Sequence, residues 1–287
     1  MRARLSTILR QASAAGCAIA ACNVYTLDQA AGVVAAAEAA RSPMVLQIHP
    51  DGARDGLWPL IAGLRVLADD AAVPVAVHLD HCADSAVIRR AIASGLDGVM
   101  ADGSRLDLEA NARFVHELAV VAHAAGLDVE AELGRLAGGE DGWTVAARAV
   151  RLTSPDAVGG FLATSGADLL AVSIGNVHGS TTVPPALDLD RLRAIRDVTD
   201  VPLVLHGGSG LDDEQLQAAV ALGICKINVN TELRGAYRDA LAGDGRPDEL
   251  VDMLARARQA VTVATMQIIK RVGSVGLLDR IPQRASE

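Results

Sequence analysis

The stretch VAVHLDHCADSAVIRRAIASGLDGVMADGS, residues 75–104, decides the predicted fold of this chain. Short apolar runs lie at 75–78 and at 98–101, and a helix-like stretch at 84–95 separates them. Asp84 stands where a helix begins and is a residue type that caps helix N-termini. The order strand, helix, strand predicts a βαβ unit whose two strands are parallel.

The same alternation recurs along all 287 residues. Short apolar runs predict eight strands, at Ala18–Asn23, Met44–Gln47, Val75–His78, Gly98–Ala101, Asp128–Glu132, Leu169–Ser173, Leu203–Leu205 and Lys226–Val229. After an amphipathic opening helix, further helices are predicted near 27–41, 57–70, 84–95, 107–125, 155–165, 188–197 and 212–222. Eight such units close into a barrel more naturally than they extend an open sheet. We therefore predict an α/β fold, a (β/α)8 TIM barrel formed by one domain over 1–287, with additional C-terminal helices at 231–242 and 247–272.

Composition and charge exclude several classes of function. The formal net charge of −9 argues against nucleic acid or an anionic membrane surface as a partner. No apolar run reaches the roughly 18 residues of a membrane span, and Arg10 interrupts the N-terminal stretch before a signal-peptide core forms. The four cysteines form no CxxC pair, so we expect buried free thiols in a reducing compartment. These features predict a cytoplasmic protein.

Polar side chains gather at or just beyond the C-terminal ends of the predicted strands. They are Asn23, Gln47, Asp80, His81, Asp102, Glu132, Asn176, His178, His206 and Asn228. In (β/α)8 barrels this end carries the active site, which is built from residues of several strands. We therefore expect the functional site there.

Three of these residues are histidines, and they would converge on the barrel axis: His81, His178 and His206. Three neutral imidazoles bind Zn²⁺ and leave one coordination position open, as a catalytic site requires. Each histidine taken alone could equally be an ordinary polar loop residue. Their joint occurrence, with Asp80 beside the first and glycines after the other two, favours a metal site.

Six motifs in this order resemble those of the class II fructose-bisphosphate and tagatose-bisphosphate aldolases. They are HLDHCAD (78–84), MADGS (100–104), VEAELGRLAGGED (129–141), AVSIGNVHG (171–179), VPLVLHGGSG (201–210) and KINVNTELR (226–234). The resemblance covers nearly the whole chain. It implies an enzyme, a class II aldolase, that cleaves and forms a carbon–carbon bond of a ketose phosphate through a metal-stabilised enediolate.

The resemblance also implies a metal cofactor. It places the family's zinc ligands on His81, His178 and His206, so one catalytic Zn²⁺ per chain is expected. Asp102 and Glu132 correspond to a second cation position, divalent or monovalent, in the family. From the residues alone, these two carboxylates could equally brace the ligand histidines as hydrogen-bond acceptors.

Acid/base roles follow from the same resemblance. Asp80 is expected to protonate the acceptor aldehyde oxygen in synthesis and to deprotonate the matching hydroxyl in cleavage. Glu140 resembles the family's mobile-loop glutamate, which moves the carbon-bound proton of the donor, although it could also be a solvated loop carboxylate. Asn228 and Asn23 are expected to hydrogen-bond the enediolate.

Lys226 begins the last predicted strand and is expected at the barrel's bottom, which weakens a Schiff-base mechanism.

A phosphate site is predicted from glycines and small polar residues after the later strands. Its members are Gly179, Gly207, Ser209, Asn230 and Thr231. Backbone N–H groups at such loops and at a helix N-terminus suit a phosphate. Gln47 and His49, at the end of the second strand, are expected at the acceptor end of the substrate. The alternative for His49 is packing against the loop near Tyr25.

The chain departs from the family at positions that hold substrate. No lysine follows His178 within a few residues, and His49 stands where the fructose-bisphosphate enzymes have a small hydroxyl residue. Asn230 replaces the aspartate or alanine that distinguishes the two sugar types, and RVGSVG at 271–276 lacks a basic residue after its Gly-Ser pair. These differences predict conserved chemistry on a changed substrate.

We therefore expect a small phosphorylated sugar or sugar acid as substrate. The 247–272 helix is long enough to pack on a neighbour, so a homodimer or homotetramer is also expected. Two alternatives stay open: a metal-dependent sugar isomerase or epimerase on the same fold, and a non-catalytic binding protein. The last would be favoured by loss of a ligand or an acid/base residue, and none is missing.

Overall fold

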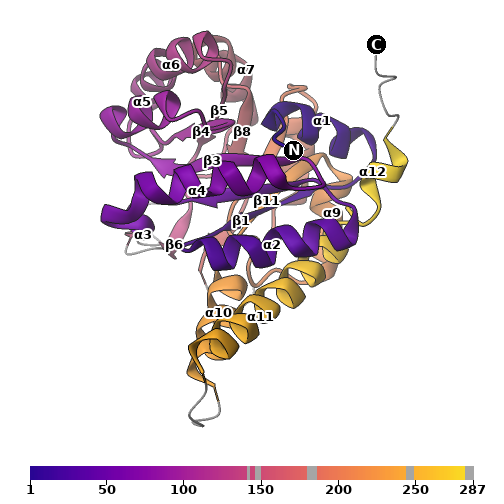
Figure 1. Cartoon of the computed structure of the whole chain (residues 1–287). Helices are drawn as coiled ribbons and strands as arrows, with labels where there is room; N and C mark the ends of the chain where they lie inside the picture. Colours follow the sequence, from indigo (N-terminus) through magenta and orange to yellow (C-terminus); the bar gives the residue numbers. More distant parts are fainter. Residues whose placement is uncertain (141–142, 146–149, 180–185, 244–248, 282–287) are drawn as a thin grey trace, which may run out of the picture.

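Eight parallel strands form a closed barrel, in the order β1-β11-β10-β8-β5-β4-β3-β2 (Figure 1). The computed structural model describes residues 1–140, 143–145, 150–179, 186–243 and 249–281. The barrel strands are β1 (Ile19–Asn23), β2 (Met44–Ile48), β3 (Val75–Cys82), β4 (Gly98–Ala101), β5 (Asp128–Leu133), β8 (Leu169–Val172), β10 (Leu203–Leu205) and β11 (Ile224–Val229). The predicted TIM barrel is confirmed.

The predicted helices are present around the barrel. They are α1 (Leu5–Ala14), α2 (Leu27–Ala40), α4 (Leu57–Asp70), α5 (Ser85–Ala93), α6 (Leu108–Ala124), α7 (Pro155–Ser165), α8 (Leu189–Arg196), α9 (Asp213–Ala221), α10 (Thr231–Ala242) and α11 (Leu250–Arg271). Three short helices that were not predicted are also present: α3 (Pro50–Ala53), η1 (Arg54–Gly56) and α12 (Leu277–Arg280). The predicted acidic caps fix two of the helix starts. Asp84 accepts the Ala86 N–H at 2.8 Å, and Asp212 accepts the Gln215 N–H at 2.8 Å.

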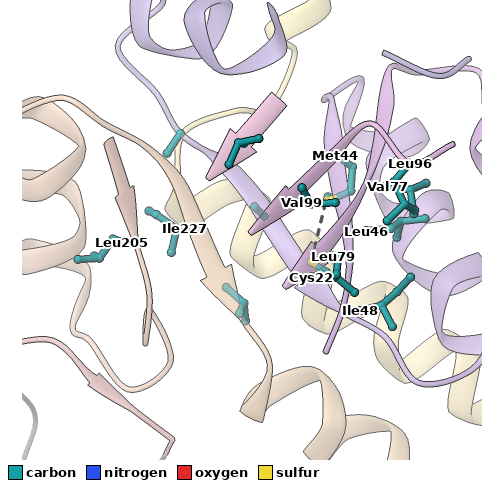
Figure 2. Packing of buried hydrophobic residues seen from close by; sticks show 14 of the residues in the cluster. Cys22, Met44, Leu46, Ile48, Val77, Leu79, Leu96, Val99, Leu205 and Ile227 are labelled. Carbon is teal, nitrogen blue, oxygen red and sulfur yellow. Dashed lines mark hydrogen bonds between the residues drawn. The ribbon is translucent and has the colours of Figure 1, made fainter. Parts of the chain in front are cut away.

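The barrel wall separates an aliphatic outer layer from a partly polar interior. Leu46 and Ile48 of β2 and Val77 and Leu79 of β3 lie in the outer layer, beneath the helices (Figure 2). The alternate residues of these strands face inward, because successive side chains of a strand point to opposite faces. The four cysteines are buried and free, as predicted.

Helix α1 packs against the bottom of the barrel interior. Its buried Leu5, Ile8 and Leu9 belong to one cluster with inward-facing residues such as Ile19 and Ala76. This apolar layer fills the N-terminal end of the barrel. The polar part of the interior therefore lies toward the C-terminal strand ends.

The RVGSVG segment also lies at the bottom of the barrel. Ser274 shares a 2.9 Å hydrogen bond with Ser42, which comes just before β2, and the Gly276 N–H donates to the Ala40 carbonyl at 2.8 Å. The expectation that this segment holds substrate is therefore wrong. Its glycines serve a chain reversal under the barrel, so the basic residue that it lacks does not bear on substrate choice.

A small sheet that was not predicted covers part of the barrel's C-terminal end. It joins β6 (Ala137–Glu140), β7 (Trp143–Val145) and β9 (Val177–His178) in the order β7-β6-β9. The segment that contains Glu140 was expected as a loop, because AGGE has few residues of high strand propensity. Hydrogen bonding to β7 and β9 makes this segment a strand although its residues have low strand propensity.

Two glycines allow the backbone of β9 to lie closely between other segments. Gly138 has φ +99° and pairs with His178, and a Cβ atom there would lie 2.1 Å from the His178 carbonyl oxygen. Gly207 has φ +63°, and a Cβ atom there would lie 2.1 Å from the Val177 carbonyl oxygen. No other residue type fits at either position without moving the backbone that carries His178.

Helices α10 and α11 form a layer on the outside of α2 (Figure 1). Gly32 of α2 is the point of closest approach, because a Cβ atom there would lie 2.8 Å from the Arg258 carbonyl oxygen and 3.2 Å from the Val261 Cβ. The Thr262 hydroxyl donates to the Gly32 carbonyl at 3.0 Å. In the described part of the chain, no helix combines the length and the apolar character that a membrane span needs.

We expect Gly32→Ala to lower the free energy of unfolding by about 1–3 kcal/mol, because the added methyl group overpacks the α2–α11 contact. Gly159→Ala is the matched control, since a methyl group added at Gly159 in α7 would meet no neighbouring segment within 4 Å. That substitution should stabilise the protein by about 0.4–1 kcal/mol. Urea unfolding of both variants measures the difference. A Gly32→Ala protein as stable as Gly159→Ala would contradict the close packing of α2 on α11.

Candidate metal centre and active site

The three predicted ligand histidines meet at the C-terminal end of the barrel. His81 lies near the end of β3, His178 ends β9 and His206 follows β10, and all three are buried. One ligand nitrogen of each lies within 4.8 Å of the other two. The ring centroids of His81 and His206 are 4.5 Å apart, and those of His81 and His178 are 4.9 Å apart. The sequence-predicted set is therefore brought together.

An irregularity in β3 brings Asp80 and His81 to the same site. Neighbouring residues of a regular strand face opposite sides of the sheet. The register of β3 on β4 shifts between Leu79 and Cys82, and His81 has φ +34°, which is rare for a residue with a Cβ. Predicted β3 ended at His78, whereas the observed strand continues through this bulge to Cys82. Local strain of this kind is typical of functional sites.

Two of the imidazoles are oriented by carboxylates. His81 Nδ1 lies 2.8 Å from Asp102 Oδ2, and His206 Nε2 lies 2.7 Å from Glu130 Oε1. The opposite nitrogens, His81 Nε2 and His206 Nδ1, then face each other at 2.7 Å. Carboxylates bound to the outer nitrogen of a histidine are a common arrangement at metal sites, where they fix the ring and its tautomer.

The charge state of the histidines suits a cation-binding site. Burial lowers the pKa of His178 well below its usual value, and burial together with His81 lowers the pKa of His206. Burial also opposes charge on His81, but the carboxylates of Asp80 and Asp102 outweigh it and raise its pKa to about 10. The carboxylates around His81 therefore favour positive charge at this position, between the three imidazoles. The donor set fits a divalent cation such as Zn²⁺.

Asp102 and Glu132 form a second group of possible ligands together with His81, again with ligand atoms within 4.8 Å of one another. Asp102 also accepts the Ser104 N–H at 3.0 Å. Burial, with Asp102 nearby, raises the pKa of Glu132 to about 8. Among the described residues, one oxygen of Glu132 has no hydrogen-bond partner. Asp102 thus braces His81, while Glu132 has an oxygen available to a second cation, so both predicted uses of this pair remain open.

Asp80 is held by two carboxamides. Asn23 Nδ2 donates to Asp80 Oδ2 at 2.8 Å, and Asn228 Nδ2 donates to Asp80 Oδ1 at 3.2 Å. Gln47 Nε2 in turn donates to Asn23 Oδ1 at 3.0 Å. Burial opposes ionisation of Asp80, but the nearby His81 and His206 hold its pKa below the ordinary range of an aspartate. Asp80 is therefore an ionised carboxylate whose two oxygens have fixed directions.

The backbone of Lys226 lies low in the barrel, as expected, because it pairs with Ile19, the first residue of β1. Its ammonium, however, reaches into the polar part of the barrel interior, which was not expected. Its fully buried ammonium donates to Asn228 Oδ1 at 2.8 Å and lies 2.8 Å from Glu130 Oε2. A pattern in the sequence could have identified Glu130 as an inward-facing residue. Carboxylates occupy every second position of β5, at Asp128, Glu130 and Glu132, in a strand that is buried throughout.

The predicted phosphate residues lie after β9, β10 and β11. Thr231 is the first residue of α10, and Asn230 accepts a hydrogen bond from the Tyr25 hydroxyl at 2.7 Å. The Ser209 hydroxyl donates to the Glu232 carboxylate. Sequence reasoning did not identify Tyr25 or Glu232 as part of this region. The segment 180–185, from which the family's lysine is missing, lies outside the described residues.

Glu140 is the last residue of β6, where its backbone pairs with Trp143. Its side chain lies outside the described part of the structure, so neither the predicted proton-transfer role nor the solvated alternative is tested. The backbone does place Glu140 two residues beyond the contact between Gly138 and His178.

A cavity of about 270 Å³ adjoins the histidine cluster between the ends of β2, β3 and β4. His49, Cys82, Asp102 and Arg105 are among its lining residues. His49 Nδ1 accepts the Asp51 N–H at 3.2 Å, and its ring centroid lies 6.1 Å from that of His81. His49 therefore lines space beside the proposed metal position. Arg105 was not identified from the sequence, since an isolated arginine in a loop gives no signal.

Comparison with known proteins gives one family along almost the whole chain. The sequence model of the family described as fructose-bisphosphate aldolase class-II matches residues 3–277. The crystal structure of a candidate fructose-1,6-bisphosphate aldolase from Coccidioides immitis is similar with a TM-score of 0.92 at 31% identity, over 97% of this chain and 99% of that one. The YdjI aldolase of Escherichia coli K12 is similar with a TM-score of 0.86 at 33% identity, over 96% and 99%. Fructose-bisphosphate aldolase from Campylobacter jejuni, at 23% identity, shares the fold with a TM-score of 0.78 over 94% of each chain.

Proposed function

The chain belongs to the class II fructose-bisphosphate aldolase family of carbon–carbon lyases, and on that premise we propose a zinc-dependent aldolase acting on a ketose phosphate or a related sugar acid. The donor fragment would resemble dihydroxyacetone phosphate. The observation that carries the proposal is the buried group His81, His178 and His206 with ionised Asp80 beside it. A divalent cation there supplies, when bound, the positive charge that stabilises an enediolate oxygen.

The residues around the cation position divide the remaining work. Asp80 is ionised and buried, so it can accept the proton of the substrate hydroxyl during cleavage and return it during synthesis. Asn23 and Asn228 fix the direction of the Asp80 carboxylate. Glu140 is proposed to move the carbon-bound proton of the donor. Its strand pairs with the strand of His178, which supports a position near the donor.

The substrate's phosphate is proposed to lie over the loops after β9, β10 and β11, with Gly179, Gly207, Ser209, Asn230 and Thr231. The start of the 12-residue helix α10 supports this, because helix N-termini attract anions. Gln47 and His49 would face the acceptor end of the substrate.

We also propose that residues 1–287 form one domain and that the protein assembles as a homodimer or homotetramer.

One screen tests the proposal against the alternative of a sugar isomerase or epimerase. Zinc-loaded protein is incubated with a panel of ketose monophosphates and bisphosphates, and release of triose phosphate is monitored. An aldolase produces two fragments from one ketose, whereas an isomerase or epimerase conserves the carbon chain. Conversion of a ketose phosphate without any triose phosphate would support the alternative.

Removal of the metal should abolish turnover, because the imidazoles alone cannot stabilise the enediolate charge. Prolonged chelation followed by Zn²⁺ or Co²⁺ should restore activity, and His178→Ala should fail to bind one equivalent of metal by direct metal analysis. Full activity after chelation, or trapping of substrate on a lysine by borohydride, would rule out this mechanism.

Asp80 and Glu140 should have separable roles in proton transfer. Asp80→Ala should block cleavage while leaving exchange of the donor proton with solvent partly intact, whereas Glu140→Ala should suppress the exchange itself. Each loss should reach about 10²–10⁴-fold, the usual size of one acid or base contribution. Asp190→Ala, an exposed substitution on α8, is the control and should change neither rate. Equal effects on exchange and cleavage in both variants would contradict the assignment.

Substrate choice should differ from that of fructose 1,6-bisphosphate enzymes. Without a lysine after His178, the pocket forgoes a charge-assisted contact worth about 1.5–3 kcal/mol, or one to two decades in affinity at about 1.4 kcal/mol per decade. We expect a lower kcat/KM for fructose 1,6-bisphosphate than for a ketose whose acceptor half is unphosphorylated or differently charged. His49→Ser should narrow that difference. Steady-state kinetics decide, and fructose 1,6-bisphosphate as the best wild-type substrate would contradict the specificity argument.

A further inference from the structure

A fully buried ion pair lies beneath the proposed metal position. Lys226 of β11 and Glu130 of β5 are both completely buried, and the ammonium lies 2.8 Å from Glu130 Oε2. Strands β5 and β11 are not neighbours, since β8 and β10 separate them, so the two side chains reach across the barrel interior. Full burial of either charge costs several kcal/mol, and an apolar pair of similar size is often as stable. Stability alone is therefore a weak reason for these residues.

Each member of the pair makes a second contact with the active site above it. Glu130 Oε1 lies 2.7 Å from His206 Nε2, and Lys226 Nζ donates to Asn228 Oδ1 at 2.8 Å. His78 Nε2 also approaches Glu130 Oε2, at 3.4 Å. One pair thus contacts both a proposed metal ligand and a residue that holds Asp80.

These contacts decide how two ambiguous side chains are oriented. An imidazole can face a metal through either nitrogen, and a carboxamide can present either its oxygen or its NH₂ group. Because Glu130 takes Nε2 of His206, Nδ1 is left to face His81 Nε2. Because Lys226 takes the oxygen of Asn228, the NH₂ group is left to donate to Asp80 Oδ1.

We propose that the Glu130–Lys226 pair is a positioning element of the active site. It sets the nitrogen that His206 presents to the metal and the orientation in which Asn228 holds Asp80. Neither residue is proposed to touch substrate or metal. This inference rests on the proposed function, since it assigns a role within the same site.

Three variants separate positioning from simple packing. Glu130→Leu removes the acceptor of His206 Nε2, Lys226→Met removes the donor to Asn228, and the double variant removes both charges. Each single variant leaves one buried charge without its partner and should be markedly destabilised in urea. The double variant should recover much of that stability, because no unpaired charge remains.

The decisive readouts are Co²⁺ affinity, the visible absorption spectrum of bound Co²⁺, and kcat with KM. We expect Glu130→Leu to bind Co²⁺ about 10–100-fold more weakly, the usual effect of losing the partner of a ligand histidine, with a shifted Co²⁺ spectrum. Lys226→Met should lower kcat more than it changes KM. The double variant should keep the weak Co²⁺ binding and the low kcat although its stability recovers.

Asp128→Asn is the matched control. Asp128 lies on the same strand, two residues below Glu130, and its buried carboxylate accepts hydrogen bonds from Arg4 and from the Ser6 N–H, away from the metal centre. The substitution should reduce stability and leave Co²⁺ affinity and spectrum unchanged. A double variant that regained wild-type Co²⁺ affinity and spectrum together with stability would overturn the proposal. Because Co²⁺ binding needs no substrate, this result is independent of whether the wild type proves to be an aldolase. If a single variant does not fold, the double variant alone is sufficient for the test.

Discussion

The crowding of three imidazoles into one buried site is the constraint on which the rest of the structure depends. Three buried ligand nitrogens lie within 4.8 Å of one another, and burial together with their mutual proximity disfavours positive charge on all three imidazoles at once. The structure meets this constraint with carboxylates on the outer nitrogens, Asp102 on His81 and Glu130 on His206. One of these carboxylates, Glu130, is paired in turn with the buried ammonium of Lys226.

The backbone also departs from regular geometry where this cluster demands it. His81 adopts a positive φ inside a strand bulge, so that it and Asp80 reach the same site. Gly138 and Gly207 allow two segments to lie against the backbone of His178. The regular part of the barrel has an aliphatic outer layer and an apolar cluster against α1. This packing stabilises the fold and offsets the free-energy cost of the strained backbone at the site. The apolar cluster against α1 thus lies at the N-terminal ends of the strands, and the strained backbone of the site lies at their C-terminal ends.

The sequence predicted most of the framework because its signals there are local. Apolar runs and helix caps such as Asp84 identified the strands and helices, and strand-end polar residues identified the site. The errors arose where position depends on contacts distant in sequence. The sheet that holds Glu140 forms through strand pairing, which propensity does not predict. The direction of the Lys226 ammonium depends on its contacts with Glu130 and Asn228. The RVGSVG segment was assigned to the wrong end of the barrel because no local pattern records which end a loop reaches. The contacts of Tyr25 with Asn230 and of Glu232 with Ser209 were likewise invisible in the sequence.

One catalytic divalent cation held by His81, His178 and His206 is the central claim, and diffraction from zinc-loaded crystals at the zinc absorption edge tests it most directly. We expect one anomalous peak at about 2.0–2.1 Å from a nitrogen of each histidine, the usual Zn–N distance. The peak should contact His206 through Nδ1, because Glu130 occupies Nε2. A peak bound only by Asp102 and Glu132, or no peak at the three histidines in fully loaded crystals, would contradict the claim.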